Sequence, residues 1–204
     1  MDDPFAPPPA AGDPFTVRAV SYPYATPWLT VEHRDVVRPD GAEGVYGIVR
    51  VAQSAVAVLP VTERGDVALV GQWRVPLGRY SWELPEGGCP ADEDPLAAAQ
   101  RELAEETGLR AASWMQILSY DVSNCLTDET ATAFLAWNLR QGPDAPDGTE
   151  VLARRTVPFA TLLDGIDRGA IRDGLTIAAV LRAHQMALAG RLPEALARAM
   201  LQGA

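Results

Sequence analysis

Lysine is absent from this sequence of 204 residues, and all 17 of its lysine-or-arginine positions hold arginine. The absence of lysine by itself excludes no function. Acidic residues outnumber basic ones by 27 to 17, which gives a net charge of −10 at pH 7. A chain this acidic is not expected to bind nucleic acid, because nucleic-acid-binding domains present a basic face. The negative net charge does not exclude binding of small molecules that carry phosphate, because a bound divalent cation reverses the local charge.

Long apolar runs are missing as well. No run reaches the roughly 18 apolar residues that a transmembrane helix needs, so no membrane association is expected. The first 15 residues are rich in proline and acidic residues, and they lack the basic segment and the apolar core of a signal peptide. We expect residues 1–15 to form a disordered arm.

Cysteine and histidine are rare, with two of each. Cys89 and Cys125 lie far apart in the sequence, so no disulfide framework is expected and the cytoplasm is the default location. Neither cysteine has the sequence context of a thiol nucleophile, and His33 and His184 are interpreted as surface or packing residues. Catalysis by a thiol is therefore not expected.

The hydrophobic pattern predicts strands, then one helix, then further strands and terminal helices. Residues 16–52 are predicted to form a small antiparallel unit. Residues 55–62 and 66–74 are predicted to form a hairpin across the turn Glu63-Arg64-Gly65. This order is typical of an α+β fold rather than a βαβ nucleotide-binding fold. The predicted strands are 16–22, 28–37, 46–52, 55–62, 66–74, 113–120, 130–139 and 151–158, and residues 81–88 are predicted to form a short strand that runs into a glycine turn. The predicted helices after residue 110 are 159–170, 174–190 and 192–202.

The first helix has local signals at both of its ends. Asp94 is a suitable N-cap, and Pro95 suits the first helical position. Gly108 suits the position just after the last turn. Together these residues predict a helix over 95–107.

This helix concentrates negative charge on one face. Glu102, Glu105 and Glu106 are three and four residues apart, and like charges at that spacing repel one another. A hard divalent cation would turn the repulsion into attraction, and Mg²⁺ is typically held by carboxylates together with substrate phosphates and waters. The cluster therefore predicts a metal, and the metal predicts a phosphate-bearing substrate.

The residues around the helix resemble the complete motif of the Nudix hydrolase superfamily. Every fixed position and both aliphatic positions of that motif are present. They are Gly87, five residues, Glu93, seven residues, Arg101-Glu102-Leu103, one residue, Glu105-Glu106, one residue and Gly108-Leu109. The resemblance implies an α/β/α sandwich and Mg²⁺-dependent cleavage of a nucleoside diphosphate linked to another group, with Mn²⁺ as a substitute cation.

The resemblance also implies roles for individual residues. Glu102 and Glu106 would bind the metal. Glu105 would be either a third ligand or a residue that contacts the ligands without binding the metal. The backbone carbonyl of Glu86 would complete the metal site. Arg101 would orient the glutamates as part of the catalytic machinery.

Two segments that flank the motif resemble those of ADP-ribose and nucleoside diphosphate sugar pyrophosphatases. They are GQWRVPLGRYSWELPEGG at 71–88 and SNCLTDETATAFLA at 123–136. Membership of this branch implies that ADP-ribose or another nucleoside diphosphate sugar is hydrolysed to a nucleoside monophosphate and a sugar phosphate. It further implies a homodimer that exchanges its N-terminal β unit. The domains would then be an arm at 1–15, the N-terminal β unit at 16–53 and the Nudix domain at 54–204.

In this branch, aromatic rings of the N-terminal unit hold the base, and Trp28 and Tyr46 occupy the matching places. Arg50 and Arg74 are candidate ligands of phosphate or sugar, because a guanidinium matches a pair of diphosphate oxygens. Arg79 is a weaker candidate of the same kind. Two alternatives stay open: Trp28 can cover a sheet edge instead, and Arg50 can form surface ion pairs.

The branch commonly uses a glutamate outside the motif as general base, which points to Glu150 on the loop before the last strand. Glu105 and Glu129 are the alternatives, and Glu150 can instead belong to an acidic solvated loop.

Two other functions also stay open. One is hydrolysis of a different diphosphate, such as NADH or a dinucleoside polyphosphate. The other is a non-catalytic ligand sensor, against which the intact glutamates argue.

Overall fold

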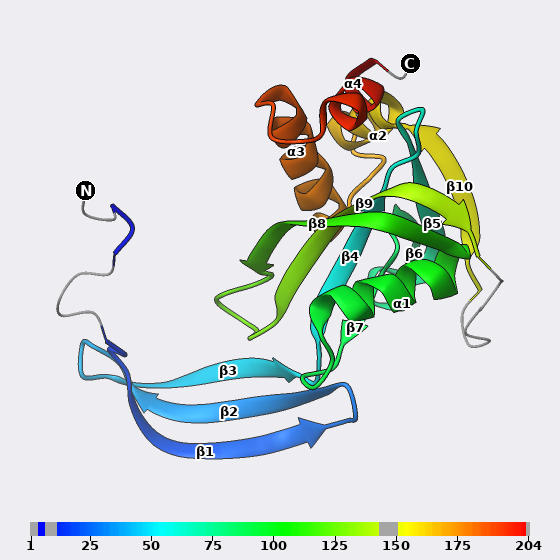
Figure 1. Ribbon diagram of the computed structural model, residues 1–204. Coiled ribbons are helices and arrows are strands. Elements are labelled where there is room, and N and C mark those ends of the chain that lie inside the picture. The colour runs from blue at the N-terminus through cyan, green and yellow to red at the C-terminus, as the bar shows by residue number, and fades with distance from the viewer. Residues whose placement is uncertain (1–3, 7–11, 143–150, 203–204) are drawn as a thin grey trace. The chain divides into compact units, whose positions relative to one another are not determined.

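The computed structural model describes residues 4–6, 12–142 and 151–202 (Figure 1). Of the predicted disordered arm, residues 1–3 and 7–11 lie outside this described part. The chain divides into two compact units, of which the first comprises residues 1–52 and 123–128 and the second the remainder.

The first unit contains an antiparallel sheet, as predicted, and its strand order is β1-β2-β3. The strands are β1 (Thr16–Ala25), β2 (Leu29–Val37) and β3 (Glu43–Val51). β1 is longer than predicted and contains Pro23, which has no N–H to donate. The pairing of β1 with β2 shifts between Ser21 and Tyr24, and β1 lies at the sheet edge, so the proline is accommodated there.

Residues 123–128 belong to this first unit although they are distant in the sequence. The amide of Val49 donates to the carbonyl of Leu126 at 2.9 Å, and the amide of Val51 donates to the Asp128 carboxylate at 3.0 Å. Arg50 Nη1 donates to the same carboxylate at 3.2 Å. The segment is thus bound along β3 by both backbone and side-chain contacts.

The second unit contains two sheets. A mixed sheet has the order β7-β4-β9-β8, in which β4 and β9 are parallel and the other pairs are antiparallel. An antiparallel sheet has the order β10-β5-β6. The strands are β4 (Ser54–Pro60), β5 (Asp66–Arg74), β6 (Arg79–Glu83), β7 (Glu86–Cys89), β8 (Leu109–Asp121), β9 (Thr130–Gln141) and β10 (Ala153–Pro158), with a 3₁₀ turn at Val75–Leu77.

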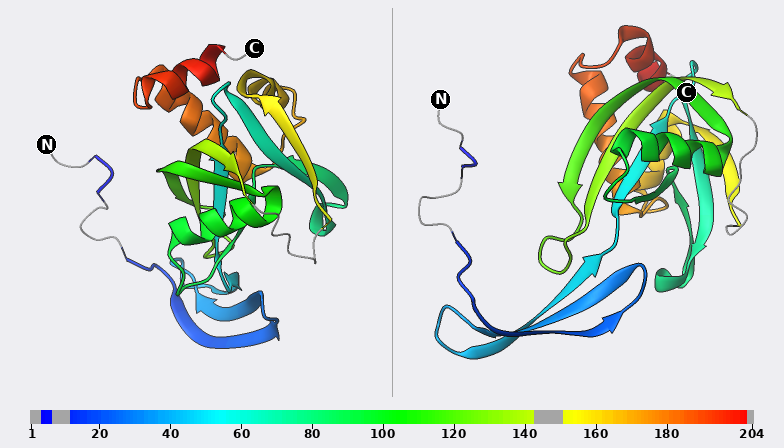
Figure 2. Two further views of the ribbon diagram at one scale, coloured as in Figure 1. Left: turned by 45° about the vertical axis from the view of Figure 1, so that its right-hand side comes forward. Right: turned by 60° about the horizontal axis from the view of Figure 1, so that its bottom comes forward.

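Helices cover both faces of the mixed sheet (Figure 2). Along β9, Phe134 and Ala136 pack in one apolar cluster with α1, whereas Ala133 and Leu135 pack in the other with the C-terminal helices. This alternation follows from the two-residue period of a strand. The helices are α1 (Pro95–Thr107), α2 (Phe159–Asp167), α3 (Gly174–Leu188) and α4 (Glu194–Gln202). The predicted α+β fold, with one sheet between helical layers, is confirmed.

Among the described helices, none combines the length and the apolar composition that crossing a membrane requires.

The bounds of α1 are those predicted from its local signals. The Asp94 carboxylate accepts hydrogen bonds from the amides of Leu96 at 3.0 Å and Ala97 at 3.1 Å. Gly108 ends the helix in the left-handed region with φ 74°, which favours glycine. The caps on both ends therefore fix which glutamates the helix carries and which way they face.

The predicted hairpin between 55–62 and 66–74 is wrong for most of its length. Thr62 and Asp66 close the turn through a 2.9 Å backbone hydrogen bond, and Val61 pairs with Val67 beside it. Beyond that bridge the strands separate, because β4 pairs with β7 and β9 while β5 pairs with β6 and β10. Turn residues specify the turn, but strands this apolar select their neighbours through long-range packing.

Residues 81–88 were predicted to form one short strand that runs into a glycine turn. This prediction is also wrong, because the segment contributes to two strands in different sheets and both glycines lie in the second strand. β6 pairs with β5, and β7 pairs with β4. Pro85 stands between them and cannot donate to a ladder, although its carbonyl accepts from the amide of Val58 at 2.9 Å. The break carries the chain from one sheet to the other and brings β7 against α1.

Candidate active site

Arg101 is the centre of an ion-pair network on α1. Its guanidinium donates to Glu93 at 2.9 Å, to Glu102 at 2.6 Å and to Glu105 at 3.2 Å. It also donates to the carbonyl of Gly88 at 2.9 Å, which ties the helix to β7. The hydrogen bond from Arg101 lowers the pKa of Glu93, and the same contact contributes most to raising the pKa of Arg101. One cation thus offsets the repulsion among three carboxylates.

Glu102 lies against the backbone of Gly87. A Cβ atom built on Gly87 would come within 2.2 Å of the carboxyl carbon of Glu102, a distance that real Cβ atoms do not show. Glycine at this position therefore leaves room for the Glu102 carboxylate, which would have to shift if residue 87 carried a Cβ atom. The contact places the carboxylate of Glu102 directly beside β7.

Glu106 reaches the same strand from the next turn of α1. Its side chain is buried, with an exposed fraction of 4%. Its Oε2 accepts a hydrogen bond from the amide of Glu86 at 2.9 Å. The backbone carbonyl of Glu106 accepts from Arg154 Nε at 2.6 Å, which anchors this turn of the helix to β10.

These contacts fit a divalent cation. Glu102 and Glu106 present carboxylate oxygens at the Glu86–Gly87 backbone, so the donor atoms gathered there are oxygens. Oxygen donors are those that Mg²⁺ and Mn²⁺ prefer. The glycine that makes room for Glu102 would be unnecessary if that carboxylate pointed to solvent.

A cavity of about 410 Å³ opens beside β7. Gly87, against which Glu102 packs, forms part of its wall, and Glu86, Glu129 and Asp173 bring three carboxylates to it. We call it the acidic cavity. Burial, followed by the nearby carboxylates of Asp173, Glu86 and Glu129, raises the pKa of Tyr120, which also lines it.

Arg74 is held at this cavity by two carboxylates. Its guanidinium donates to Glu83 at 2.6 Å and to Glu86 at 2.6 Å. Oxygens of Glu83, Glu86 and Asp173 all lie within 4.8 Å of one another. Burial, and then the charges of Asp173 and Glu83, raise the pKa of Glu86. Its Oε2 is buried and has no hydrogen-bond partner among the described residues.

Glu83 and Asp173 were not predicted from the sequence as site residues. Asp173 does cap α3, accepting from the amide of Thr176 at 2.6 Å. The Thr176 hydroxyl accepts from the amide of Leu84 at 2.9 Å, which fixes the start of α3 beside the β6–β7 connection. For Glu83, the available signal was a carboxylate between apolar residues of a buried strand, which requires a partner.

The substrate-binding residues predicted outside the motif fall in both units. Trp28, Tyr46 and Arg50 belong to the first unit, whereas Arg74 and Arg79 belong to the second. Arg79 pairs with Arg74 across β5 and β6. The predicted base Glu150 lies outside the described residues.

Within the first unit, two of the three predicted residues have side-chain partners. Tyr46 donates its hydroxyl to the carbonyl of Cys125 at 3.2 Å. Arg50 donates to the buried Glu32 at 2.8 Å and to Asp128, so ion pairs occupy its guanidinium. Trp28 follows β1 and is 75% exposed.

Comparisons with known proteins agree on one family. The family model of the NUDIX domain matches residues 51–180. The ADP-ribose pyrophosphatase of Mycobacterium tuberculosis is 34% identical over 154 residues, which are 74% of this chain and 74% of that protein. The ADP-sugar pyrophosphatase of Mus musculus is 32% identical over 178 residues, covering 79% of this chain and 81% of that protein.

A solved structure is similar in fold. The crystal structure of an ADP compounds hydrolase superposes with a TM-score of 0.77 at 20% sequence identity. The match covers 87% of this chain and 97% of that chain. At this level of identity the likeness concerns the fold alone.

Substitution of Gly87 tests whether the position of Glu102 matters. In Gly87→Ala, the new methyl group would displace the Glu102 carboxylate, which is the mobile end of a side chain. We expect a melting temperature near that of the wild type and a loss of turnover on the order of 100-fold, the usual cost of a catalytic group misplaced by about 1 Å. Gly47→Ala, where a Cβ meets nothing within 4 Å, is the control. Undiminished turnover in Gly87→Ala would contradict the assignment.

Proposed function

Because the chain belongs to the Nudix family, in its ADP-ribose pyrophosphatase branch, we propose that it hydrolyses ADP-ribose or another nucleoside diphosphate sugar. The bond cleaved is the diphosphate linkage, and the products are a nucleoside monophosphate and a sugar phosphate. The observation that carries the proposal is the convergence of Glu102 and Glu106 on the β7 backbone, beside a cavity of about 410 Å³.

Glu102 and Glu106 are the proposed ligands of Mg²⁺, with Glu105 close by and the backbone carbonyl of Glu86 completing the site. A bound divalent cation supplies positive charge that offsets the substrate diphosphate and makes water more acidic. Arg101 holds Glu102 and Glu105 in place. Arg101 is therefore proposed to act on catalysis by positioning these carboxylates.

For the general base, the sequence favours Glu150, and the described residues offer two alternatives. Glu129 lines the acidic cavity. Glu105 is bound to Arg101 and lines a different cavity on the outer side of α1. A base must come within hydrogen-bond reach of the water that it activates. If Glu150 is not the base, this requirement favours Glu129 over Glu105, because Glu129 lines the cavity in which the substrate phosphates are proposed to bind.

The acidic cavity is the proposed site for the phosphates and the sugar. Arg74 lines it, and its side chain is 34% exposed, so one guanidinium edge can bind a substrate oxygen. Carboxylates such as Asp173 accept hydrogen bonds from sugar hydroxyls. The surplus of carboxylates disfavours a phosphate unless a cation accompanies it, which agrees with a metal-dependent reaction.

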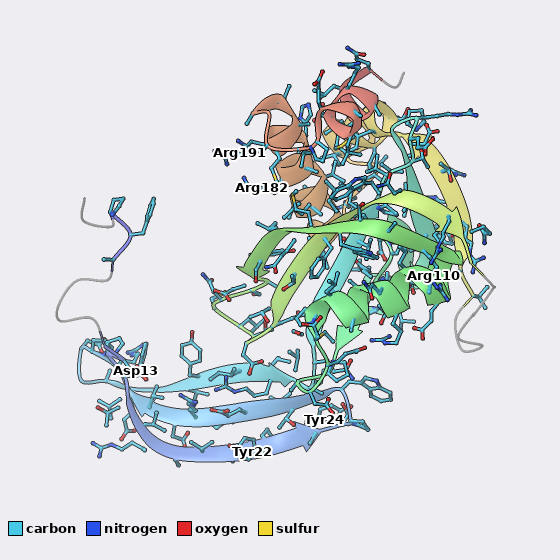
Figure 3. All side chains as sticks on the ribbon, in the orientation of Figure 1. Asp13, Tyr22, Tyr24, Arg110, Arg182 and Arg191 are labelled. Carbon is cyan, nitrogen blue, oxygen red and sulfur yellow. The ribbon has the colours of Figure 1, made fainter. Side chains whose placement is uncertain are left out.

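The first unit is proposed to hold the base and to join two copies of the chain. Its sheet exposes large apolar side chains, with Tyr22 at 62%, Tyr24 at 59% and Val45 at 63%. Figure 3 shows Tyr22 and Tyr24 on β1. Large apolar side chains left exposed on a sheet favour association with another protein surface. They support a homodimer with an exchanged N-terminal unit. The cytoplasmic location stays a prediction from the sequence.

A role of Trp28 in stacking on the base predicts a specific kinetic change. Trp28→Ala should raise KM by about 10-fold or more and leave kcat nearly unchanged, because base stacking contributes ~1–3 kcal/mol. Steady-state kinetics with ADP-ribose measures both constants. The control is Trp73→Ala, which removes another exposed tryptophan. An unaltered KM in Trp28→Ala would assign Trp28 to packing at the sheet edge.

A substrate panel tests the proposed reaction itself. ADP-ribose, GDP-mannose, UDP-glucose, NADH and diadenosine polyphosphates would be incubated with the protein and Mg²⁺, and the products separated by chromatography. We expect fastest release of a nucleoside monophosphate from one of the nucleoside diphosphate sugars. Preference for NADH or a dinucleoside polyphosphate would support the alternative hydrolase. Cleavage of none by a folded, Mg²⁺-binding chain would contradict the proposal.

A further inference from the structure

Two arginines face each other across a pair of strands in the second unit. Arg110 of β8 and Arg140 of β9 are direct partners in the antiparallel ladder. Like charges directly opposite one another destabilise a sheet. Arg110 donates to the carbonyl of Leu109 at 3.4 Å, and neither arginine forms an ion pair with any described residue. Within the described part of the chain, this pair therefore lacks a counter-charge.

Both arginines line a cavity of about 460 Å³ on the outer side of α1. Gln100, Arg101 and Glu105 of α1 form one wall, and Trp114 of β8 lies opposite. We call it the arginine cavity, and it shares no lining residue with the acidic cavity. Figure 3 shows Arg110 beside the end of α1.

The charge of the arginine cavity contrasts with that of the chain. The net charge of the sequence is −10, yet three arginines and one glutamate line this cavity. Arg101 is already bound to Glu93, Glu102 and Glu105. Among the described residues, the arginines of this cavity that form no ion pair are therefore Arg110 and Arg140.

The side chains suit a phosphate group. A guanidinium donates two parallel hydrogen bonds to a pair of phosphate oxygens, and two guanidinium groups can share one such group. Trp114 is fixed behind them, because its indole N–H donates to the carbonyl of Ala111 at 3.1 Å and its ring lies edge-on to Phe134 at 6.4 Å. Its ring supplies an apolar wall on which a flat group can stack.

We propose that the arginine cavity is a binding site for a phosphate-bearing anion, separate from the acidic cavity. The ligand neutralises Arg110 and Arg140 and thereby removes the repulsion across β8 and β9. The source of the phosphate is either inorganic phosphate or a mononucleotide whose base contacts Trp114. This inference does not depend on the proposed hydrolysis, because Arg110, Arg140 and Trp114 have no role in that proposal and do not line the acidic cavity.

Equilibrium dialysis of the whole chain against radiolabelled inorganic phosphate in EDTA tests the site. Without divalent cations the acidic cavity repels phosphate, so binding reports on the arginine cavity. We expect saturable binding by the wild type and a loss of affinity of at least about 10-fold in Arg110→Gln/Arg140→Gln, as expected when two charge-assisted contacts are removed. Phosphate should also raise the melting temperature of the wild type more than that of this variant.

The matched control is Arg64→Gln/Arg191→Gln, which removes the same charge from two exposed arginines without ion pairs among the described residues. It should bind phosphate like the wild type. No saturable binding by the wild type, equal binding by Arg110→Gln/Arg140→Gln, or an equal loss in the control would overturn the proposal. Dialysis against AMP and ribose 5-phosphate separates the sources: tighter binding of AMP indicates a base on Trp114, and equal binding indicates recognition of phosphate alone.

Discussion

The ion pairs between Arg101 and the glutamates are the constraint on which the rest of the site depends. Glu102 and Glu105 would repel each other on α1, and the guanidinium that binds both also binds Glu93 and the backbone of Gly88. These bonds hold α1 against β7. β7 can lie there only because the chain leaves one sheet at Pro85 and enters the other. The position of α1, the strand break at Pro85 and the close approach at Gly87 therefore depend on one another.

Charge is separated on the two sides of α1. Glu102 and Glu106 lie against the Glu86–Gly87 backbone of β7, and both of these β7 residues line the acidic cavity. On the outer side, Arg110 and Arg140 line a cavity with surplus positive charge. A cation suits the first side and an anion suits the second. The proposed catalytic metal and the proposed anion site thus follow from the same electrostatic reasoning with opposite signs.

The sequence predicted best what local chemistry determines. The caps Asp94 and Gly108 gave the bounds of α1, and the order of strands and helices gave the α+β class. Pairing between distant residues was not predictable in this way. The β4–β5 hairpin failed because long-range packing selects strand neighbours. Asp173 reaches the cavity only because Thr176 binds Leu84, a contact between residues 92 positions apart.

The most direct test of the account is the affinity of Glu106→Gln for Mn²⁺, followed by electron paramagnetic resonance. An amide oxygen can still accept the hydrogen bond of Glu86, so the variant should melt like the wild type. We expect its Mn²⁺ affinity and its turnover of ADP-ribose with Mg²⁺ each to fall by about 100-fold or more. Loss of a residue that binds the metal directly should reduce affinity at least as much as loss of a residue that only holds such a ligand in place. Glu63→Gln, at an exposed glutamate, should change neither. Wild-type metal affinity and turnover in Glu106→Gln would contradict the claim that α1 holds the catalytic cation.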